Sequence, residues 1–173
     1  HRAIVGLLLA ALLPPCTGAT QAQTREYQKR RSFRHNAAVH AIAYSGKGVF
    51  QNYGGDKNER MPSLWQRTLT NNPAIAWDFT AFTPEAVVVN LGTNDFSAPI
   101  TEGEFVGAYA ALLGDIRQKY PAAMIFCVTW AGWGASKEGW VETAMAQSGD
   151  PNLRHVGFSI DPADGYGCDY HTN

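Results

Sequence analysis

Residues 90–96 contain side chains that could take part in acyl transfer. They read Asn-Leu-Gly-Thr-Asn-Asp-Phe. The backbone can turn sharply at Gly92, and the side-chain amide of Asn94 could then donate a hydrogen bond to the oxyanion that develops during acyl transfer. Glycine, asparagine and aspartate are also common in ordinary turns at strand ends. Taken alone, this loop therefore favours a turn over a catalytic site.

A second loop, residues 45–48, reads Ser-Gly-Lys-Gly. Paired glycines let the backbone approach a ligand closely, and the backbone N–H of Gly46 would be a second oxyanion donor. The spacing matches neither a dinucleotide-binding fingerprint nor a phosphate loop. Alone, this segment also favours a glycine-rich turn.

The third loop, residues 164–171, reads Asp-Gly-Tyr-Gly-Cys-Asp-Tyr-His. His171 would be the general base, and Asp169, two residues earlier, could hold the imidazole in one tautomer. A nucleophile pair of Cys168 with His171 is conceivable, but so short a spacing leaves little room for a substrate carbonyl. No second cluster of histidine or cysteine occurs at ligand spacing, so we expect no metal and no cofactor.

The elements that would carry these loops alternate between strand and helix. Buried strands are predicted at residues 39–44, 86–91, 123–129 and 153–160, and helices at 62–69, 101–120 and 137–147. The clearest helix begins with a capping box of Thr101 and Glu104 and ends before Pro121. This alternation predicts an α/β fold with a parallel sheet, in which ligands bind at the carboxyl ends of the strands.

The amino-terminal residues have a different composition. Residues 1–23 are typical of a secretory signal peptide, because an arginine precedes a short apolar run, and that run cannot span a bilayer. Residues 24–38 form a basic linker or non-matching segment, and residues 39–173 form the domain. We therefore expect a secreted or periplasmic protein.

Length and charge exclude several classes of protein. The 173 residues suffice for one domain, and 45% of them are hydrophobic, as in globular proteins. A formal net charge of -1 predicts neither a nucleic acid nor a membrane as partner.

The three loops, in this order, resemble the SGNH (GDSL-type) hydrolases. The stretches AYSGKGVFQNYGG, MPSLWQRTL, WDFTAFTPEAVVVNLGTNDFS and DGYGCDYH are similar to carbohydrate esterase family 2 over residues 40–171. The resemblance implies a flavodoxin-like three-layer α/β/α fold and deacetylation of polysaccharides such as xylan. It implies that Gly46 and Asn94 form the oxyanion hole, that His171 is the base and that Asp169 is its acidic partner.

The family's nucleophile motif, Gly-Asp-Ser, is not found in the sequence. The resemblance implies a position for it upstream of His40, at the end of a first strand. Ser32 follows no predicted strand, and Ser45 adjoins the oxyanion glycine. We therefore expect a domain that is incomplete at both ends, marginally stable, and inactive or nearly so.

Three interpretations remain. The chain is a fragment of a carbohydrate acetyl esterase, or it is a non-catalytic relative that binds acetylated poly- or oligosaccharides. In the second case Trp130 and Trp133, with Trp140, are candidate stacking residues. The third interpretation, a nucleotide-binding α/β domain, is disfavoured because no phosphate motif is present.

Overall fold

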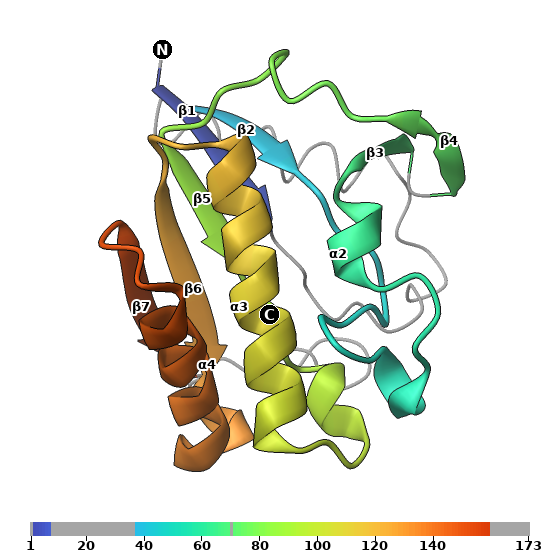
Figure 1. The fold of residues 1–173 in the computed structure, drawn as a ribbon, viewed down its shortest axis with the longest axis vertical. Helices are drawn as coiled ribbons and strands as arrows, with labels where there is room; N and C mark the ends of the chain where they lie inside the picture. Colours follow the sequence, from blue (N-terminus) through green and yellow to red (C-terminus); the bar gives the residue numbers. More distant parts are fainter. Residues whose placement is uncertain (1, 8–36, 70, 160–173) are drawn as a thin grey trace.

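The computed structural model describes residues 2–7, 37–69 and 71–159 of the chain. Its centre is a five-stranded sheet in which all neighbouring strands run parallel, in the order β2-β1-β5-β6-β7 (Figure 1). The α/β fold with a mostly parallel sheet that the sequence predicts is confirmed. The strands are β1 (Arg2–Leu7), β2 (Ala37–Ala41), β5 (Ala86–Val89), β6 (Met124–Trp130) and β7 (Leu153–Phe158).

Strand β1 occupies the place of the first strand of the sheet, so the prediction that this strand is missing was wrong. It pairs with β2 on one side and with β5 on the other. A strand buried within a parallel sheet and the core of a signal peptide are both short apolar runs, so the same residues match both patterns. The signal segment over residues 1–23 remains a prediction, because pairing within the sheet does not test export.

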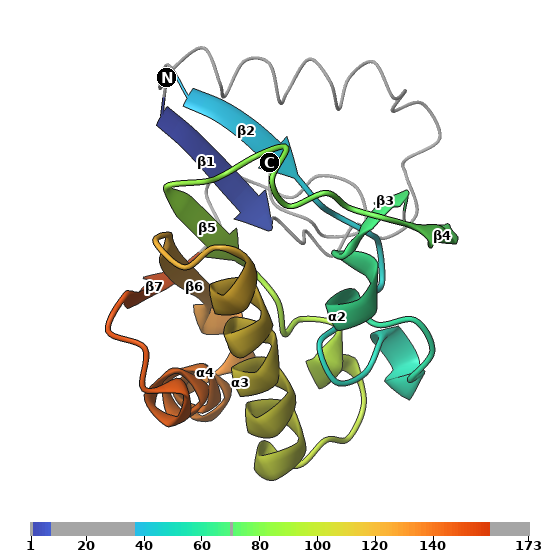
Figure 2. The ribbon, with the colours of Figure 1, turned by 45° about the horizontal axis from the view of Figure 1, so that its top comes forward.

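Helices α3 (Glu102–Lys119) and α4 (Ala135–Ser148) pack together on one face of the sheet (Figure 2). The predicted capping box is present, since Thr101 and Glu104 exchange hydrogen bonds between side chain and backbone. No helix in the described part of the chain is long and apolar enough to cross a membrane. The core between α3 and the sheet includes Phe105, Tyr109, Leu112, Leu113, Ile116, Val87, Val89 and Ile125.

The helix predicted over residues 62–69 is only half right. Helix α2 (Met61–Leu64) is short, and β3 (Arg67–Leu69) then pairs antiparallel with β4 (Asn72–Ala76). The Thr68 hydroxyl donates to the carbonyl oxygen of Ala76 at 2.9 Å. Thr68 is β-branched and suits a strand, and the pairing of β3 with β4 stabilises that strand. The chain therefore does not continue as a helix to Leu69, although its apolar residues have helical spacing.

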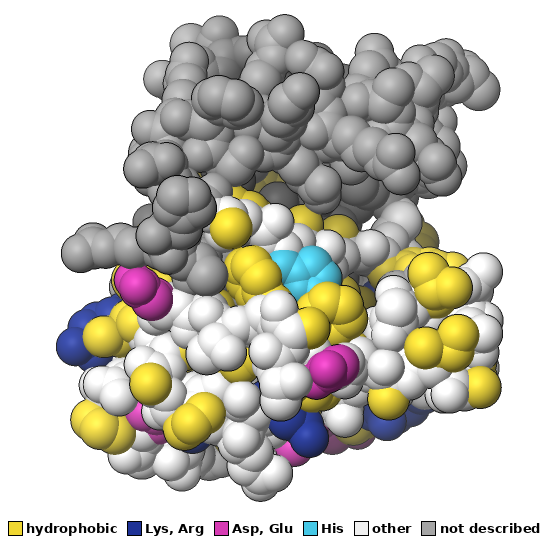
Figure 3. Space-filling model, turned by 90° about the horizontal axis from the view of Figure 1, so that it is seen from above, with side chains coloured by type: hydrophobic (Ala, Val, Ile, Leu, Met, Phe, Trp, Pro, Cys, Tyr) yellow, Lys and Arg dark blue, Asp and Glu magenta, His cyan; other side chains and the backbone are white. Residues whose placement is uncertain are grey.

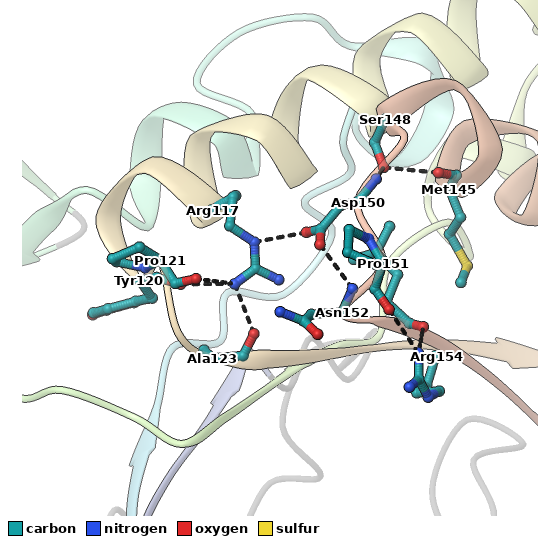
Figure 4. A network of polar contacts seen from close by, with 11 residues as sticks. Arg117, Tyr120, Pro121, Ala123, Met145, Ser148, Asp150, Pro151, Asn152 and Arg154 are labelled. Atoms are coloured by element: carbon teal, nitrogen blue, oxygen red, sulfur yellow. Dashed lines mark hydrogen bonds and ion pairs between the residues drawn. The ribbon is translucent and has the colours of Figure 1, made fainter.

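Arg117 connects the end of α3 to the turn between α4 and β7 (Figure 4). Its Nε donates to Oδ2 of Asp150 at 2.7 Å. Its Nη1 donates to the carbonyl oxygens of Tyr120, Pro121 and Ala123 at 3.0, 3.0 and 2.7 Å. The carbonyl group of Tyr120 at the end of α3 has no partner within the helix, so the Arg117 guanidinium caps it. The same guanidinium also binds the turn before β6 and the turn before β7.

Candidate functional site

The loops after β2 and β5 lie at the same edge of the sheet, on either side of the carboxyl end of β1. This arrangement follows from the strand order, because β1 has β2 as one neighbour and β5 as the other. In open parallel sheets, ligands bind at such a point, where the chain connections diverge to opposite sides. The loops at residues 45–48 and 90–96 therefore lie at one edge of the sheet, as a common site would require.

Gly46 lies in a tight turn after β2. Its φ of +73° is in the left-handed region, which favours glycine. The backbone N–H of Tyr53 donates to the Gly46 carbonyl oxygen at 2.8 Å, which orients this peptide. No acceptor among the described residues takes the Gly46 N–H.

Asn94 lies in the loop after β5 and is 6% exposed. Its Nδ2 donates to the carbonyl oxygen of Lys47 at 2.8 Å, so its carboxamide lies beside the residue that follows Gly46. A carboxamide has two N–H groups, and no described residue accepts the second. The structure therefore brings together the two residues that the resemblance assigns to an oxyanion hole, and their role remains a prediction.

Asp95 joins the two loops of this site, a role that was not predicted from the sequence. It is fully buried, and its carboxylate accepts hydrogen bonds from the backbone N–H groups of Val49, Phe50 and Gln51. Burial raises the pKa of the Asp95 carboxyl, although these N–H groups act in the opposite direction. One feature of the sequence could have indicated this role: an aspartate directly follows a buried strand and its turn. A carboxylate that is buried there needs hydrogen-bond donors from another part of the chain.

The other side of the Asn94 loop packs against an indole ring. Gly92 has a φ of +136°, and a Cβ there would lie 2.9 Å from the Trp133 ring. Trp133, in the 3-10 helix η3 (Ala131–Trp133), donates from Nε1 to the Thr93 hydroxyl at 3.1 Å. Trp133 therefore supports the loop, and its proposed stacking role is untested.

The remaining tryptophans differ in their surroundings. Trp130 ends β6 and is half-buried over Gly132. Trp140 packs against Phe96 and Phe105, with ring centroids 5.8 and 6.2 Å apart. Trp140 is thus part of the core side of α4, whereas Trp130 remains a candidate for ligand contact.

The base and its acidic partner, His171 and Asp169, lie outside the described residues, as does Cys168. A nucleophile in the family's position would come soon after β1. The sequence there is apolar, and the first hydroxyl or thiol after Leu7 is that of Cys16. Within residues 2–7, 37–69 and 71–159, no group of three acidic, histidine or cysteine side chains could hold a metal ion.

A second histidine-centred array lies between α4 and strands β6 and β7. The Thr129 hydroxyl oxygen is 2.8 Å from Nε2 of His155, whose Nδ1 is 3.0 Å from Oε1 of Glu142. This order of hydroxyl, imidazole and carboxylate is that of a nucleophile with its base. Thr129 is fully buried, however, and its hydroxyl donates to Glu138. The array therefore joins α4 to the sheet and is closed to substrate.

Comparison with known proteins agrees with this arrangement. The model of the GDSL-like lipase/acylhydrolase family matches residues 15–154. The chain belongs to this family. It is 37% identical over 147 residues to the cellulase/esterase CelE of Acetivibrio thermocellus, and 26% identical over 93 residues to an acetylxylan esterase/glucomannan deacetylase of Cellvibrio japonicus. This GDSL-like chain is therefore close to the carbohydrate esterases of family two.

A solved relative shares the fold over nearly the whole chain. The structure of a family two carbohydrate esterase from Clostridium thermocellum in complex with cellohexaose has a TM-score of 0.79 and 29% identity. The match to CelE covers 80% of this chain, the match to the deacetylase covers 52%, and the match to the solved structure covers 98%. They cover 18%, 26% and 58% of those proteins, so this GDSL-like chain spans less than two thirds of each.

Proposed function

We propose that this GDSL-like chain recognises acetyl esters on polysaccharides such as xylan. One observation carries the proposal: Nδ2 of Asn94 donates to the carbonyl oxygen of Lys47 at 2.8 Å, so the carboxamide is bound to the residue that follows Gly46. Two donors at the end of a parallel sheet suit a carbonyl oxygen that gains negative charge. The relatives named as a cellulase/esterase and an acetylxylan esterase support a carbohydrate ester as the ligand.

The reaction class is carboxylic ester hydrolysis. When a nucleophile attacks an acetyl group, the carbonyl oxygen becomes an oxyanion, which the N–H of Gly46 and an N–H of Asn94 would stabilise. His171 would take the proton of the attacking group, and Asp169 would hold the imidazole in the required tautomer.

The missing Gly-Asp-Ser motif limits this chemistry. An oxyanion hole without its nucleophile retains only about 10³–10⁴-fold catalysis over water. We therefore propose that the chain binds acetyl esters and hydrolyses them far more slowly than an esterase that has its nucleophile.

An assay of the full chain tests both parts. Acetate release from acetylated xylan should be near background, and acetylated xylan should bind more tightly than the deacetylated polymer. Asn94→Ala should weaken binding of the acetylated polymer by about tenfold, the loss of one hydrogen bond to a charged or polarised group. Asn71→Ala, at an exposed turn, is the matched control and should bind normally. Ordinary turnover would contradict the inactivity, and equal affinity for both polymers would contradict ester recognition.

A second candidate function is glycan binding that does not depend on the ester. Trp130 is half-buried at the carboxyl end of β6, where its flat face could stack on a sugar ring. The relative bound to cellohexaose supports such a ligand. If cellohexaose binding falls in Trp130→Ala and is unchanged in Asn94→Ala, this second function is the better description.

We also propose that the chain acts outside the cytoplasm, secreted or periplasmic, where polysaccharides occur. The signal-like composition of residues 1–23 supports this. Fusion of these residues to a reporter that is active only after export tests the proposal, and an inactive fusion contradicts it.

A further inference from the structure

The carboxylate of Asp95, in the loop after β5, accepts hydrogen bonds from three consecutive backbone N–H groups in the loop after β2. Oδ1 accepts from the N–H groups of Val49, Phe50 and Gln51 at 3.1, 2.7 and 3.1 Å, and Oδ2 accepts from Val49 at 3.0 Å. Successive N–H groups that converge in this way form an anion-binding concavity. Here the anion is a side chain of the protein itself.

The contact between the loops is reciprocal. The side-chain amide of Gln51 donates to the carbonyl oxygen of Asp95 at 2.8 Å and to those of Ala98 and Pro99 at 3.2 and 3.3 Å. The Gly54 N–H, in η1 (Tyr53–Gly55), donates to the Ser97 hydroxyl in η2 (Asp95–Ser97) at 2.8 Å. Backbone and side-chain groups of each loop thus bind the other loop, with Asp95 at the centre.

Both proposed oxyanion donors are adjacent to this contact. Asn94 directly precedes Asp95, and Gly46 is three residues before Val49. Between them, Gly48 leaves no free space, because a Cβ there would lie 1.9 Å from the Gln51 carbonyl oxygen and 2.6 Å from Oδ2 of Asp95. Asn94 binds the carbonyl oxygen of Lys47 and Asp95 binds the N–H of Val49, so both side chains fix the short segment that follows Gly46.

We propose that Asp95 is the positioning residue of the oxyanion hole: its carboxylate holds residues 49–51 and so sets the Gly46 N–H relative to the Asn94 carboxamide. This inference rests on the proposed function of those two donors. A carboxylate presents only acceptors, whereas the isosteric amide of asparagine would turn an NH2 group toward one of the N–H donors. Asp95→Asn therefore disturbs the contact without changing the size of the side chain.

The experiment uses the full chain, labelled with ¹⁵N, and sodium acetate as the smallest probe with an acyl oxygen. In the wild type, acetate should shift the resonances of the Gly46 amide and the Asn94 side chain along one saturation curve. In Asp95→Asn the acetate affinity should fall by about tenfold or more, equivalent to about 1.4 kcal/mol. The matched control is Asp78→Asn, which alters an exposed carboxylate that accepts from Thr80 elsewhere, and should behave as the wild type.

The outcomes separate the two proposals. If Asp95→Asn binds acetate as tightly as the wild type, with the same shifts at both resonances, the positioning role is wrong and the oxyanion hole stands. If acetate shifts neither resonance in the wild type, the hole itself is wrong, and the role of Asp95 falls with it. Thermal unfolding of both variants tests whether each is folded. An Asp95→Asn chain that unfolds at the wild-type temperature but binds acetate weakly supports the positioning role. If the weaker binding is accompanied by a matching loss of thermal stability, the role of Asp95 is structural only.

Discussion

A Cβ atom on Gly48 would lie 2.6 Å from Oδ2 of the buried Asp95 carboxylate, closer than side chains approach in folded proteins. Gly48→Ala should therefore destabilise the chain by about 3 kcal/mol, the upper end of the cost of overpacking. The turn from Gly48 to Gln51 and the Asp95 side chain must both shift to admit the methyl group. Urea unfolding monitored by tryptophan fluorescence measures this loss.

Gly107→Ala is the control for that substitution. Gly107 lies within α3 and is exposed, and a Cβ atom added there would meet no atom within 4 Å. Alanine there should stabilise the chain by about 0.8–1 kcal/mol, because glycine is a poor helix former. Equal unfolding free energies for the two variants would contradict the close packing at Gly48.

The titration of Asp95 should give stability a specific dependence on pH. Because burial raises its pKa in the folded chain, the native state binds this proton more tightly than the unfolded state does. The contribution to stability is thus fully present below the unfolded pKa and is lost as pH rises through the folded pKa. Asp95→Asn lacks this term, so the wild type should lose stability relative to Asp95→Asn as pH rises from acid to neutral.

Urea unfolding of both chains at several pH values measures that difference. Asp78→Asn provides the opposite sign, because hydrogen bonds from Thr80 lower the pKa of Asp78 in the folded chain. A wild type that gains stability over Asp95→Asn with rising pH would mean that the three N–H donors outweigh burial.

The Arg117 guanidinium should not be replaceable by an ammonium group. Lysine has no planar fork, so it cannot bond Asp150 and the three carbonyl oxygens at the end of α3 together. The two side chains are 22% and 13% exposed, so the pair is largely shielded from water. Arg117→Lys should cost about 2 kcal/mol and Arg117→Ala about 3 kcal/mol, near the lower end for breaking a buried pair.

Arg154→Lys is the matched control for the Arg117 variants. Arg154 is exposed, and its Nη1 donates to the carbonyl oxygens of Pro151 and Leu153. Its loss should change the unfolding free energy by less than about 0.5 kcal/mol. If Arg117→Lys is equally mild, the network in Figure 4 contributes little to stability.

Local sequence patterns predict most of the helices and strands of this fold. The strands that they do not predict depend on contacts between residues far apart in the chain. The capping box at Thr101 and the apolar run at residues 86–91 are local signals, and the structure has α3 and β5 there. The strand from Arg67 to Leu69 depends on pairing with β4, which no local pattern shows. The apolar residues of β1 match a signal peptide equally well, and only their neighbours in the sheet distinguish the two.

The candidate site also has features that the sequence predicts and contacts that it does not. Residue types alone favour ordinary turns at Gly46 and Asn94, and the family resemblance assigns both to an oxyanion hole. The structure brings the two loops together. The contact of Asp95 with Val49 joins residues 46 positions apart, so no local sequence pattern predicts it. The sequence shows an aspartate after the turn, but neither its burial nor the N–H groups that it binds.

His40 gives the chain a second and opposite pH response. Its ring lies in β2, with the Trp77 ring centroid at 4.5 Å and that of Phe82 at 5.7 Å, and its buried Nδ1 has no hydrogen-bond partner in the described structure. In the view from above, a histidine side chain is bordered by hydrophobic ones (Figure 3). Burial lowers the pKa of His40, because the charged imidazolium is poorly solvated there.

A lowered pKa means that the unfolded chain binds this proton more readily than the native chain does. Stability should therefore decrease as pH falls through the unfolded value of about 6.5. His40→Phe keeps an aromatic ring against Trp77 and removes both the titration and the unpaired nitrogen, so it should be less sensitive to acid than the wild type. Urea unfolding at pH 5 and pH 8 measures this, and equal losses in the two chains would show that His40 does not titrate on unfolding.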